Sequence, residues 1–170
     1  MTGARRTLLA ASAGLVLIGM SAIVQSDPII VWNATASVRI GFYLVTPIEQ
    51  LHVDDLVAVT APAQLERWMV ERDYIGPDTP LLKYVAALPS ANVGRIGTTI
   101  LIDGSAVAAA LSRDRTGRSL PVWSGCQRLA EGQVFLLNTD TPASLDGRYF
   151  GPIGSDTIIG RATPLWTREG

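Results

Sequence analysis

Lys83 is the only lysine among the 14 basic residues of this 170-residue chain, and it lies inside the apolar run 81–88 (LLKYVAAL). Alternate side chains of a β strand share a face, so Lys83 faces the same way as Leu81, Val85 and Ala87. An ammonium group in such surroundings loses water, which lowers its pKa and lets the neutral amine act as a general base. An arginine there would stay protonated. The alternative is a lysine that reaches solvent from a strand edge or pairs with an acid.

Ser37 is a candidate nucleophile because it lies among small residues in the segment 33–43 (NATASVRIGFY). Thr35, two residues earlier, can direct its hydroxyl toward an oxyanion that forms at Ser37. The backbone N–H of Ser37 offers a second donor to the same oxyanion. Small polar residues also make ordinary surface loops, so this segment alone leaves both interpretations open.

A third cluster of polar residues lies late in the chain, where Ser144, Asp146 and Arg148 occupy alternate positions. In an extended segment all three share one face. Ser144 can then hold the lysine amine by a hydrogen bond, and Asp146 and Arg148 can form a bracing ion pair. The alternative is an Asp-Gly turn that carries a surface charge pair, which contributes little to stability.

The rare residue types exclude several kinds of chemistry. One cysteine, Cys126, cannot form an internal disulfide, and one histidine, His52, cannot supply an HExxH zinc site. A Ser-His-Asp triad would have to use His52, whose acidic neighbours Asp54 and Asp55 indicate a solvated turn. No phosphate-binding glycine loop is present, and the pI of about 5.8 gives no basic surface for nucleic acid. We therefore expect no metal, no cofactor and no nucleic-acid partner.

Residues 7–24 form an uncharged stretch of 18 residues that follows Arg5 and Arg6. As a helix it would span roughly 27 Å, close to the thickness of a bilayer core. The preceding arginines favour a cytoplasmic N-terminus, with the rest of the chain outside the membrane. The stretch is either a signal peptide, cleaved near residues 24–26, or a retained anchor. The apolar run 28–32 that follows it favours the anchor. We thus divide the chain into a cytoplasmic N-terminus and membrane segment, 1–26, and a periplasmic domain, 27–170.

The periplasmic domain is expected to be mainly β with one short helix. The pattern predicts a helix over 62–72, with Leu65, Trp68 and Met69 on one face. Asp103-Gly104 predicts a tight hairpin between residues 98–102 and 105–107, because this pair readily adopts positive φ angles. Further short strands are predicted at 55–59, 81–88, 133–137 and 157–159, and an exposed loop at 112–119.

Taken together and in this order, the segments resemble the membrane-bound signal peptidase family that uses a Ser/Lys dyad. The similarity is closest to its conjugative-transfer branch, the TraF-type peptidases. Residues 33–43 resemble the serine block of the family, 81–89 its lysine block and 144–153 its Ser-x-Asp-x-Arg block, and 52–59 resembles the Gly-Asp strand. The resemblance implies a signal-peptidase-like β domain behind a transmembrane helix. The roles that it implies are Ser37 as nucleophile, Lys83 as general base, Thr35 and the Ser37 amide as oxyanion donors, and Ser144, Asp146 and Arg148 as supporting residues.

Four positions depart from the family pattern without removing a dyad member. Arg39 stands where the branch usually has proline, Tyr84 replaces an arginine after the lysine, Asp54 replaces the glycine of the Gly-Asp pair, and Gly147 replaces a serine. In addition, the lysine block closes on the sequence Pro-Ser-Ala-Asn at 89–92 instead of Pro-Gly-Asp. The resemblance still implies an active enzyme, and the departures concern loop shape and substrate preference.

The predicted function is that of a membrane-anchored serine endopeptidase that processes signal-peptide-bearing or prepilin substrates, in pilin maturation for conjugative transfer. The predicted location is the bacterial inner membrane, with a single span and a periplasmic catalytic domain. The expected partners are a prepilin or preprotein substrate, membrane lipid and other proteins of the conjugation machine. The alternatives are a general leader peptidase of the same family and a non-catalytic, anchored periplasmic module of a secretion or conjugation system.

Overall fold

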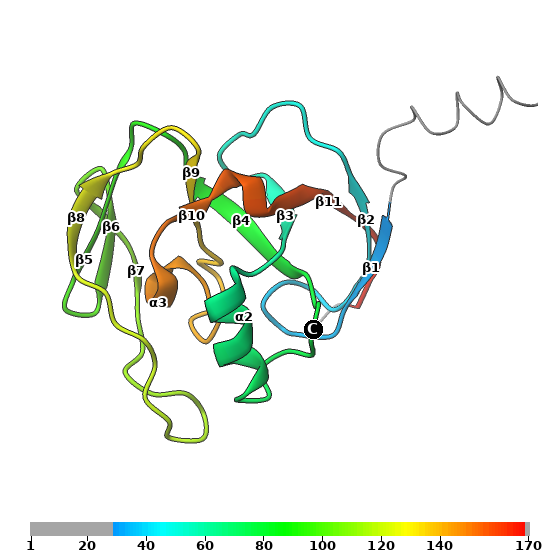
Figure 1. The fold of residues 1–170 in the computed structure, drawn as a ribbon, viewed down its shortest axis with the longest axis horizontal. Coiled ribbons are helices and arrows are strands. Elements are labelled where there is room, and N and C mark those ends of the chain that lie inside the picture. Colours follow the sequence, from blue (N-terminus) through cyan, green and yellow to red (C-terminus); the bar gives the residue numbers. More distant parts are fainter. Residues whose placement is uncertain (1–28, 169–170) are drawn as a thin grey trace, which may run out of the picture.

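The computed structural model describes residues 29–168, which form two antiparallel β sheets at opposite ends of the domain (Figure 1). The larger sheet has the strand order β1-β2-β11-β3-β4-β9-β10. Its strands are β1 Ile29–Asn33, β2 Gly41–Thr46, β3 Leu56–Val59, β4 Leu81–Ala87, β9 Gln133–Leu136, β10 Ile153–Gly154 and β11 Ile158–Thr167. The prediction of a mainly β domain is confirmed.

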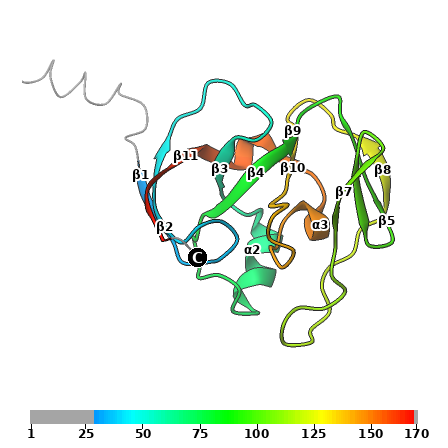
Figure 2. The same cartoon turned by 180° about the vertical axis from the view of Figure 1, so that it is seen from behind.

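The smaller sheet has the order β7-β6-β5-β8 and is seen from behind in Figure 2. Its strands are β5 Asn92–Ile96, β6 Thr99–Ile102, β7 Ser105–Ala109 and β8 Gly125–Arg128. The predicted hairpin is confirmed as β6 and β7, with Asp103 and Gly104 at φ angles of 48° and 81°. These angles are those of the tight turn that Asp-Gly favours.

The main core joins the two sheets. Phe135 and Ala87 of the larger sheet pack with Val93 and Ile100 of the smaller sheet. A second cluster on the larger sheet contains Val57, Val59, Val85, Val134 and Leu136. Full burial of such a side chain stabilises the fold by roughly 1.5–3 kcal/mol. Strand β4 contributes to both clusters, so the strand that carries Lys83 is fixed by the best-packed part of the domain.

The predicted helix is confirmed as α2, Ala63–Val70, which begins directly after Pro62. Met69 is buried, and Trp68 stacks on Tyr74 with their ring centroids 5.3 Å apart. Two short helical turns follow later in the chain, α3 Gly147–Phe150 and the 3-10 turn η1 Ser155–Thr157. Residues 112–119 form the predicted loop, closed by a bridge between Arg113 and Ser119.

The last strand is much longer than the sequence predicted. Glycine and proline ordinarily interrupt a strand, so residues 157–159 are the only part expected from the pattern. Strand β11 instead runs to Thr167 beside both β2 and β3, and its register shifts near Gly160 and Pro164. These shifts absorb the irregular residues. A Cβ atom on Gly160 would lie 2.3 Å from the carbonyl oxygen of Thr46, so glycine is what permits the close approach of the two strands.

Two further segments differ from expectation. The apolar residues that follow the predicted anchor form strand β1, whose residues pair with β2 from Ile29 to Asn33. The segment from Ser144 to Arg148 is not extended, because the Asp146 side chain accepts a hydrogen bond from the Arg148 backbone and begins α3. Strands β5 and β8 were not predicted, since Gly94 interrupts the first and every residue of the second is exposed.

The predicted membrane segment 7–24 and the domain boundary at residue 26 lie outside the described residues. Between residues 29 and 168, no helix is both long and apolar enough to cross a membrane.

Candidate active site

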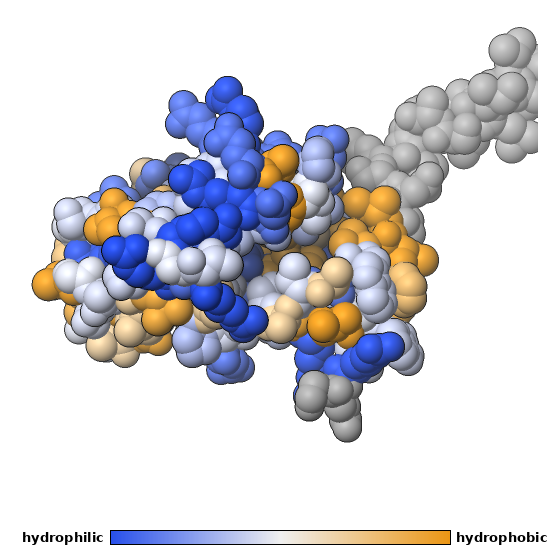
Figure 3. Space-filling view, turned by 90° about the horizontal axis from the view of Figure 1, so that it is seen from below, coloured by the Kyte–Doolittle hydropathy of each residue, from blue (hydrophilic) through white to orange (hydrophobic). Residues whose placement is uncertain are grey.

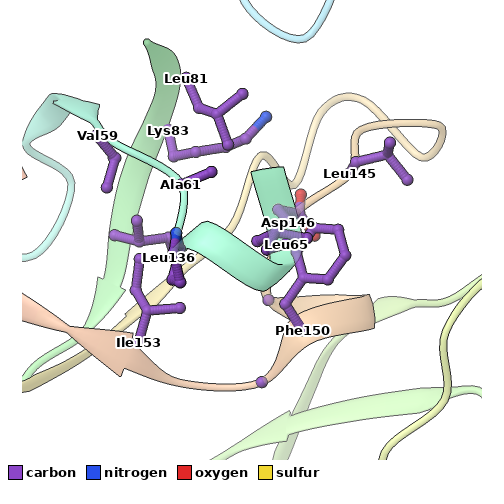
Figure 4. A pocket seen from close by; sticks show the side chains of 13 residues that line it. Val59, Ala61, Leu65, Leu81, Lys83, Leu136, Leu145, Asp146, Phe150 and Ile153 are labelled. Carbon is purple, nitrogen blue, oxygen red and sulfur yellow. The ribbon is translucent and has the colours of Figure 1, made fainter. Parts of the chain in front are cut away.

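Lys83 is buried in the middle of β4, where it pairs with Val57 of β3 and is only 5% exposed. A narrow, mainly apolar cavity lies against its side chain, between β4, α2 and α3 (Figure 4). The lining residues include Leu65 of α2, Leu136 of β9, and Leu145 and Phe150 near α3. Lys83 therefore does not reach solvent from a strand edge, as the alternative interpretation would require.

Burial lowers the pKa of Lys83 from its ordinary value of 10.5 to about 8. The nearby carboxylate of Asp146 opposes this shift, and the guanidinium of Arg148 adds to it. With a pKa of about 8, roughly one amine in ten is neutral at pH 7, against roughly one in three thousand for an ordinary lysine. The environment thus makes Lys83 far better suited to accept a proton than a surface lysine.

Ser144 holds the amine of Lys83. The Lys83 Nζ donates a hydrogen bond to Ser144 Oγ at 3.0 Å, and Ser144 is itself buried. The structure therefore brings together two side chains that are 61 residues apart in the sequence. The contact is the one that the sequence analysis expected for Ser144.

Asp146 and Arg148 form a fully buried ion pair. Arg148 Nε and Nη2 each donate to one carboxylate oxygen of Asp146 at 3.0 Å, and the two side chains are 1% exposed or less. Arg148 also donates to the backbone carbonyls of Pro142, Thr141 and Asn138. The surface charge pair offered as an alternative is wrong, because this pair lies inside the domain and ties together the loop that carries Ser144.

Ser37 lies in a tight turn between β1 and β2, and Asn33 organises that turn. The Asn33 side chain donates to the carbonyls of Thr35, Val38 and Arg39, and its Oδ1 accepts the hydroxyl proton of Thr35 at 2.9 Å. The Thr35 and Ser37 hydroxyls are 2.9 Å apart. Since Thr35 gives its proton to Asn33, Ser37 is the donor to Thr35.

The hydroxyl of Ser37 is therefore directed at Thr35, and no hydrogen bond joins it to Lys83 in residues 29–168. The two residues are connected through Asn138, whose side-chain nitrogen lies 2.9 Å from the Ser37 carbonyl oxygen and 3.3 Å from Ser144 Oγ. The predicted nucleophile and base thus belong to one hydrogen-bonded network. Their catalytic roles stay predictions.

Ser37 also lines an open cleft of about 480 Å³. Its walls come from the turn that carries Ser37, from Tyr84 on β4, from residues 138–141 and from Arg168 near the C-terminus. The cleft is lined by Tyr84 and the cavity by Lys83, and these neighbours on β4 have side chains on opposite faces of the strand. A peptide in the cleft would lie against the predicted nucleophile.

His52 takes no part in this network. Its side chain is 62% exposed, and its Nδ1 lies 3.7 Å from Asp55, which pairs with Arg161. Its backbone N–H also donates to the Asp55 carboxylate, as in a solvated turn. In the described part of the chain, no three His, Cys, Asp or Glu side chains are grouped as metal ligands.

The sequence analysis missed Asn33 and Asn138. Each asparagine directly follows an apolar stretch, Asn33 after residues 29–32 and Asn138 after residues 134–137. A polar residue that can both donate and accept at the end of an apolar stretch is a weak signal for a structural hydrogen-bond centre. That signal was available, but it identifies no partner.

Comparison with known proteins gives a family model, several relatives and a solved structure. The family model described as signal peptidase, peptidase S26, matches residues 4–166. A conjugal transfer protein TraF of Agrobacterium fabrum is 34% identical over 147 residues, which cover 79% of this chain and 81% of that protein. A plasmid transfer protein TraF of Escherichia coli is 27% identical, over 95% of this chain and 98% of that protein. A solved signal peptidase I of Enterococcus faecalis V583 aligns at 21% identity and a TM-score of 0.41, over 68% of this chain and 99% of that chain.

The chain therefore belongs to the signal peptidase family, peptidase S26. The resemblance to the TraF-type branch is also confirmed, because its curated relatives carry that name.

The pKa of Lys83 can be measured directly by NMR. Because the chain has one lysine, labelling it with carbon-13 lysine gives the signal of that residue alone. We expect the folded protein to show a titration with a pKa of about 8, since burial disfavours the ammonium form. The same sample in denaturant should titrate near the ordinary value of about 10.4. A folded-state titration that matches the denatured one would show that the amine is solvated.

Proposed function

We propose that the protein is a membrane-anchored serine endopeptidase that uses Ser37 as nucleophile and Lys83 as general base. The observation that carries this proposal is the buried amine of Lys83, whose pKa is lowered to about 8 and which is held by Ser144. A lysine base needs a lowered pKa and a fixed amine, and Lys83 has both. Membership of a peptidase family supports the same conclusion.

The proposed reaction starts from neutral Lys83, which removes the hydroxyl proton of Ser37 while the Ser37 oxygen attacks the scissile carbonyl carbon. The Thr35 hydroxyl and the Ser37 N–H stabilise the negative oxygen that results. Lys83 then gives its proton to the leaving amine, and the acyl group stays on Ser37 as an ester. Attack by water, or by an amine of the substrate itself, releases the acyl group and returns the proton to Ser37.

This sequence of steps requires two changes from the structure. The Ser37 hydroxyl donates to Thr35, and it has to rotate toward Lys83 before the proton can be transferred. Such a rotation of a serine side chain is a change between staggered rotamers. Thr35 in turn has to redirect its proton from Asn33 to the substrate oxygen. Binding of a peptide in the cleft beside Ser37 supplies the acceptor for that proton.

The proposed substrates are prepilins or other signal-peptide-bearing proteins. The relatives named for conjugal and plasmid transfer support a prepilin and, as partners, other proteins of a conjugation machine. A general leader peptidase of the same family would use the same residues on a wider range of preproteins. A non-catalytic periplasmic module would bind such a protein without cleaving it.

Processing of a prepilin-like peptide tests the dyad. We expect Ser37→Ala and Lys83→Arg each to lose nearly all cleavage, because the first lacks the nucleophile and the second cannot become neutral. Lys83→Met replaces the lysine with an uncharged side chain of similar length, and this variant should be equally inactive. The matched control is Ser105→Ala, an exposed serine on β7. Cleavage would be followed by mass spectrometry, and folding by circular dichroism.

Full activity in folded Lys83→Arg would exclude Lys83 as the base. Binding of the peptide by the wild type without any cleavage would favour the non-catalytic module.

Thr35 can be tested separately from the dyad. We expect Thr35→Val to lower kcat by roughly 10²–10³, the effect of one lost oxyanion donor, while Thr35→Ser retains most activity. The measurement is steady-state kinetics with the same peptide. Equal activity of the valine and serine variants would remove Thr35 from the oxyanion role.

An exposed aromatic cluster supports the proposed location at a membrane. Trp32 of β1, Phe42 of β2 and Trp166 of β11 are 44–52% exposed, and their ring centroids lie 4.7 to 6.4 Å apart. Ile29 and Ile30 of β1 and Leu165 of β11 are also exposed. Apolar residues gather at this end of the domain in Figure 3. Since β1 begins only four residues after the apolar stretch 7–24, we propose that this cluster, Trp32, Phe42 and Trp166, lies in the bilayer interface.

Fluorescence quenching by brominated lipids tests this location in the full chain reconstituted in vesicles. The chain has four tryptophans. We expect quenching to persist when Trp68 and Trp123 are replaced by Phe, and to vanish when Trp32 and Trp166 are replaced. Equal quenching in the two double variants would show that the cluster does not contact lipid.

A further inference from the structure

The geometry points to Asn138 as a positioning residue that aligns the Ser37 turn with the strand that carries Lys83. Asn138 lies two residues after the end of β9 and is 2% exposed. The preceding residue, Leu137, donates from its backbone to the carbonyl of Tyr84, so this part of the chain is already fixed beside β4. The inference rests on the proposed function, because it assigns the residue a part in that reaction.

The side-chain amide of Asn138 contacts the backbone of the two residues next to Lys83 in the sequence. Its Oδ1 accepts from the backbone N–H of Tyr84 at 3.2 Å, and its Nδ2 lies 3.3 Å from the carbonyl oxygen of Leu82. These are the residues directly after and directly before the lysine. The same Nδ2 lies 3.3 Å from the hydroxyl of Ser144, which holds the lysine amine.

The amide also reaches the nucleophile turn. Its Nδ2 lies 2.9 Å from the carbonyl oxygen of Ser37, which is the shortest of its side-chain contacts. Thr141 gives the Ser37 carbonyl a second, longer contact of 3.3 Å, but among residues 29–168 its side chain makes no hydrogen bond to β4. Asn138 is therefore the residue whose side chain bonds directly to both the serine turn and the lysine strand.

Only an amide suits this position. The Tyr84 N–H needs an acceptor, while the carbonyl oxygens of Ser37 and Leu82 need a donor, and a primary amide offers both on adjacent atoms. An apolar side chain would remove this donor and this acceptor, and the Ser37 carbonyl would keep only its longer contact to Thr141. A carboxylate would keep the acceptor but place negative charge against the two carbonyl oxygens and beside Lys83.

Asn138 is itself held by the buried ion pair. Its backbone N–H donates to Asp146 Oδ2 at 3.0 Å, and its carbonyl oxygen accepts from Arg148. The ion pair thus acts on the serine turn through Asn138 and on the lysine amine through Ser144. In this arrangement the separation of nucleophile and base depends on the orientation of one amide.

The test compares Asn138→Asp and Asn138→Leu with the control Asn92→Leu, an exposed asparagine on β5 whose side chain donates to Asp103 in the turn between β6 and β7. Both Asn138 variants should lower kcat, on the order of 10², with little change in KM, because misalignment by about 1 Å has that effect. The Asn138→Asp variant should also raise the pKa of Lys83 in the carbon-13 titration. Asp146 and Arg148 are the charged groups that face the amine, and the new aspartate adds a second negative charge near it. The control should behave as the wild type.

A readout without the reaction separates this inference from the proposed function. Arg39 is an exposed trypsin site in the Ser37 turn, and Asn33 and Tyr43 bond its carbonyl oxygen. We expect limited digestion, analysed by mass spectrometry, to cut after Arg39 at least several times faster in both Asn138 variants than in the control.

If the wild type cleaves no peptide, the proposed function is overturned, and with it the role of Asn138 in catalysis. Faster trypsin cutting of the Asn138 variants would then show only that Asn138 holds the Ser37 turn. Unchanged kcat and unchanged cutting in folded Asn138→Asp would overturn the inference, even if Asn138→Leu fails to fold.

Discussion

The buried ion pair between Asp146 and Arg148 is the interaction on which the site depends. Burying two charges costs solvation free energy, and the attraction between them offsets that cost only because further hydrogen bonds satisfy both groups. Here Asp146 accepts from the Asn138 backbone, and Arg148 donates to three carbonyls of the same loop. The result is a rigid loop from residue 138 to residue 148. Removing either charge would leave the other buried and unpaired, at about 3–5 kcal/mol, so the loop is fixed in one conformation.

The same pair shapes the electrostatics at Lys83. A carboxylate alone beside a buried lysine would keep it protonated, because an opposite charge favours the ammonium form. Arg148 opposes this influence of Asp146, and burial remains the largest cause of the lowered pKa. The loop therefore positions Ser144 against the amine without supplying a net negative charge that would prevent the amine from acting as a base. The rigidity of the loop and the balanced charge beside the amine come from the same two residues.

Local patterns predicted the parts of the fold that local rules determine. The Asp103-Gly104 turn and the helix after Pro62 follow from backbone preferences, and the burial of Lys83 follows from strand alternation in 81–88. Contacts across the chain did not follow from any local rule. Strand β11 tolerates Gly160 and Pro164 only because its register shifts against two neighbours, and Asn138 bonds a carbonyl 101 residues away. The burial of the Asp146 pair likewise depends on a short helix that the alternation of residues 144, 146 and 148 does not predict.

Three of the departures from the family pattern, Gly147, Arg39 and Tyr84, fall into two physical groups. Gly147 replaces a serine where a Cβ atom would lie 2.7 Å from both the Leu136 carbonyl oxygen and the Phe135 ring, so glycine lets α3 pack closely on β9. Arg39 and Tyr84 instead line the cleft beside Ser37, and the Tyr84 side chain points away from the buried face that holds Lys83. Neither residue contacts the lysine amine. Variation at these two positions therefore changes the walls that a peptide meets and leaves the surroundings of the base unaltered.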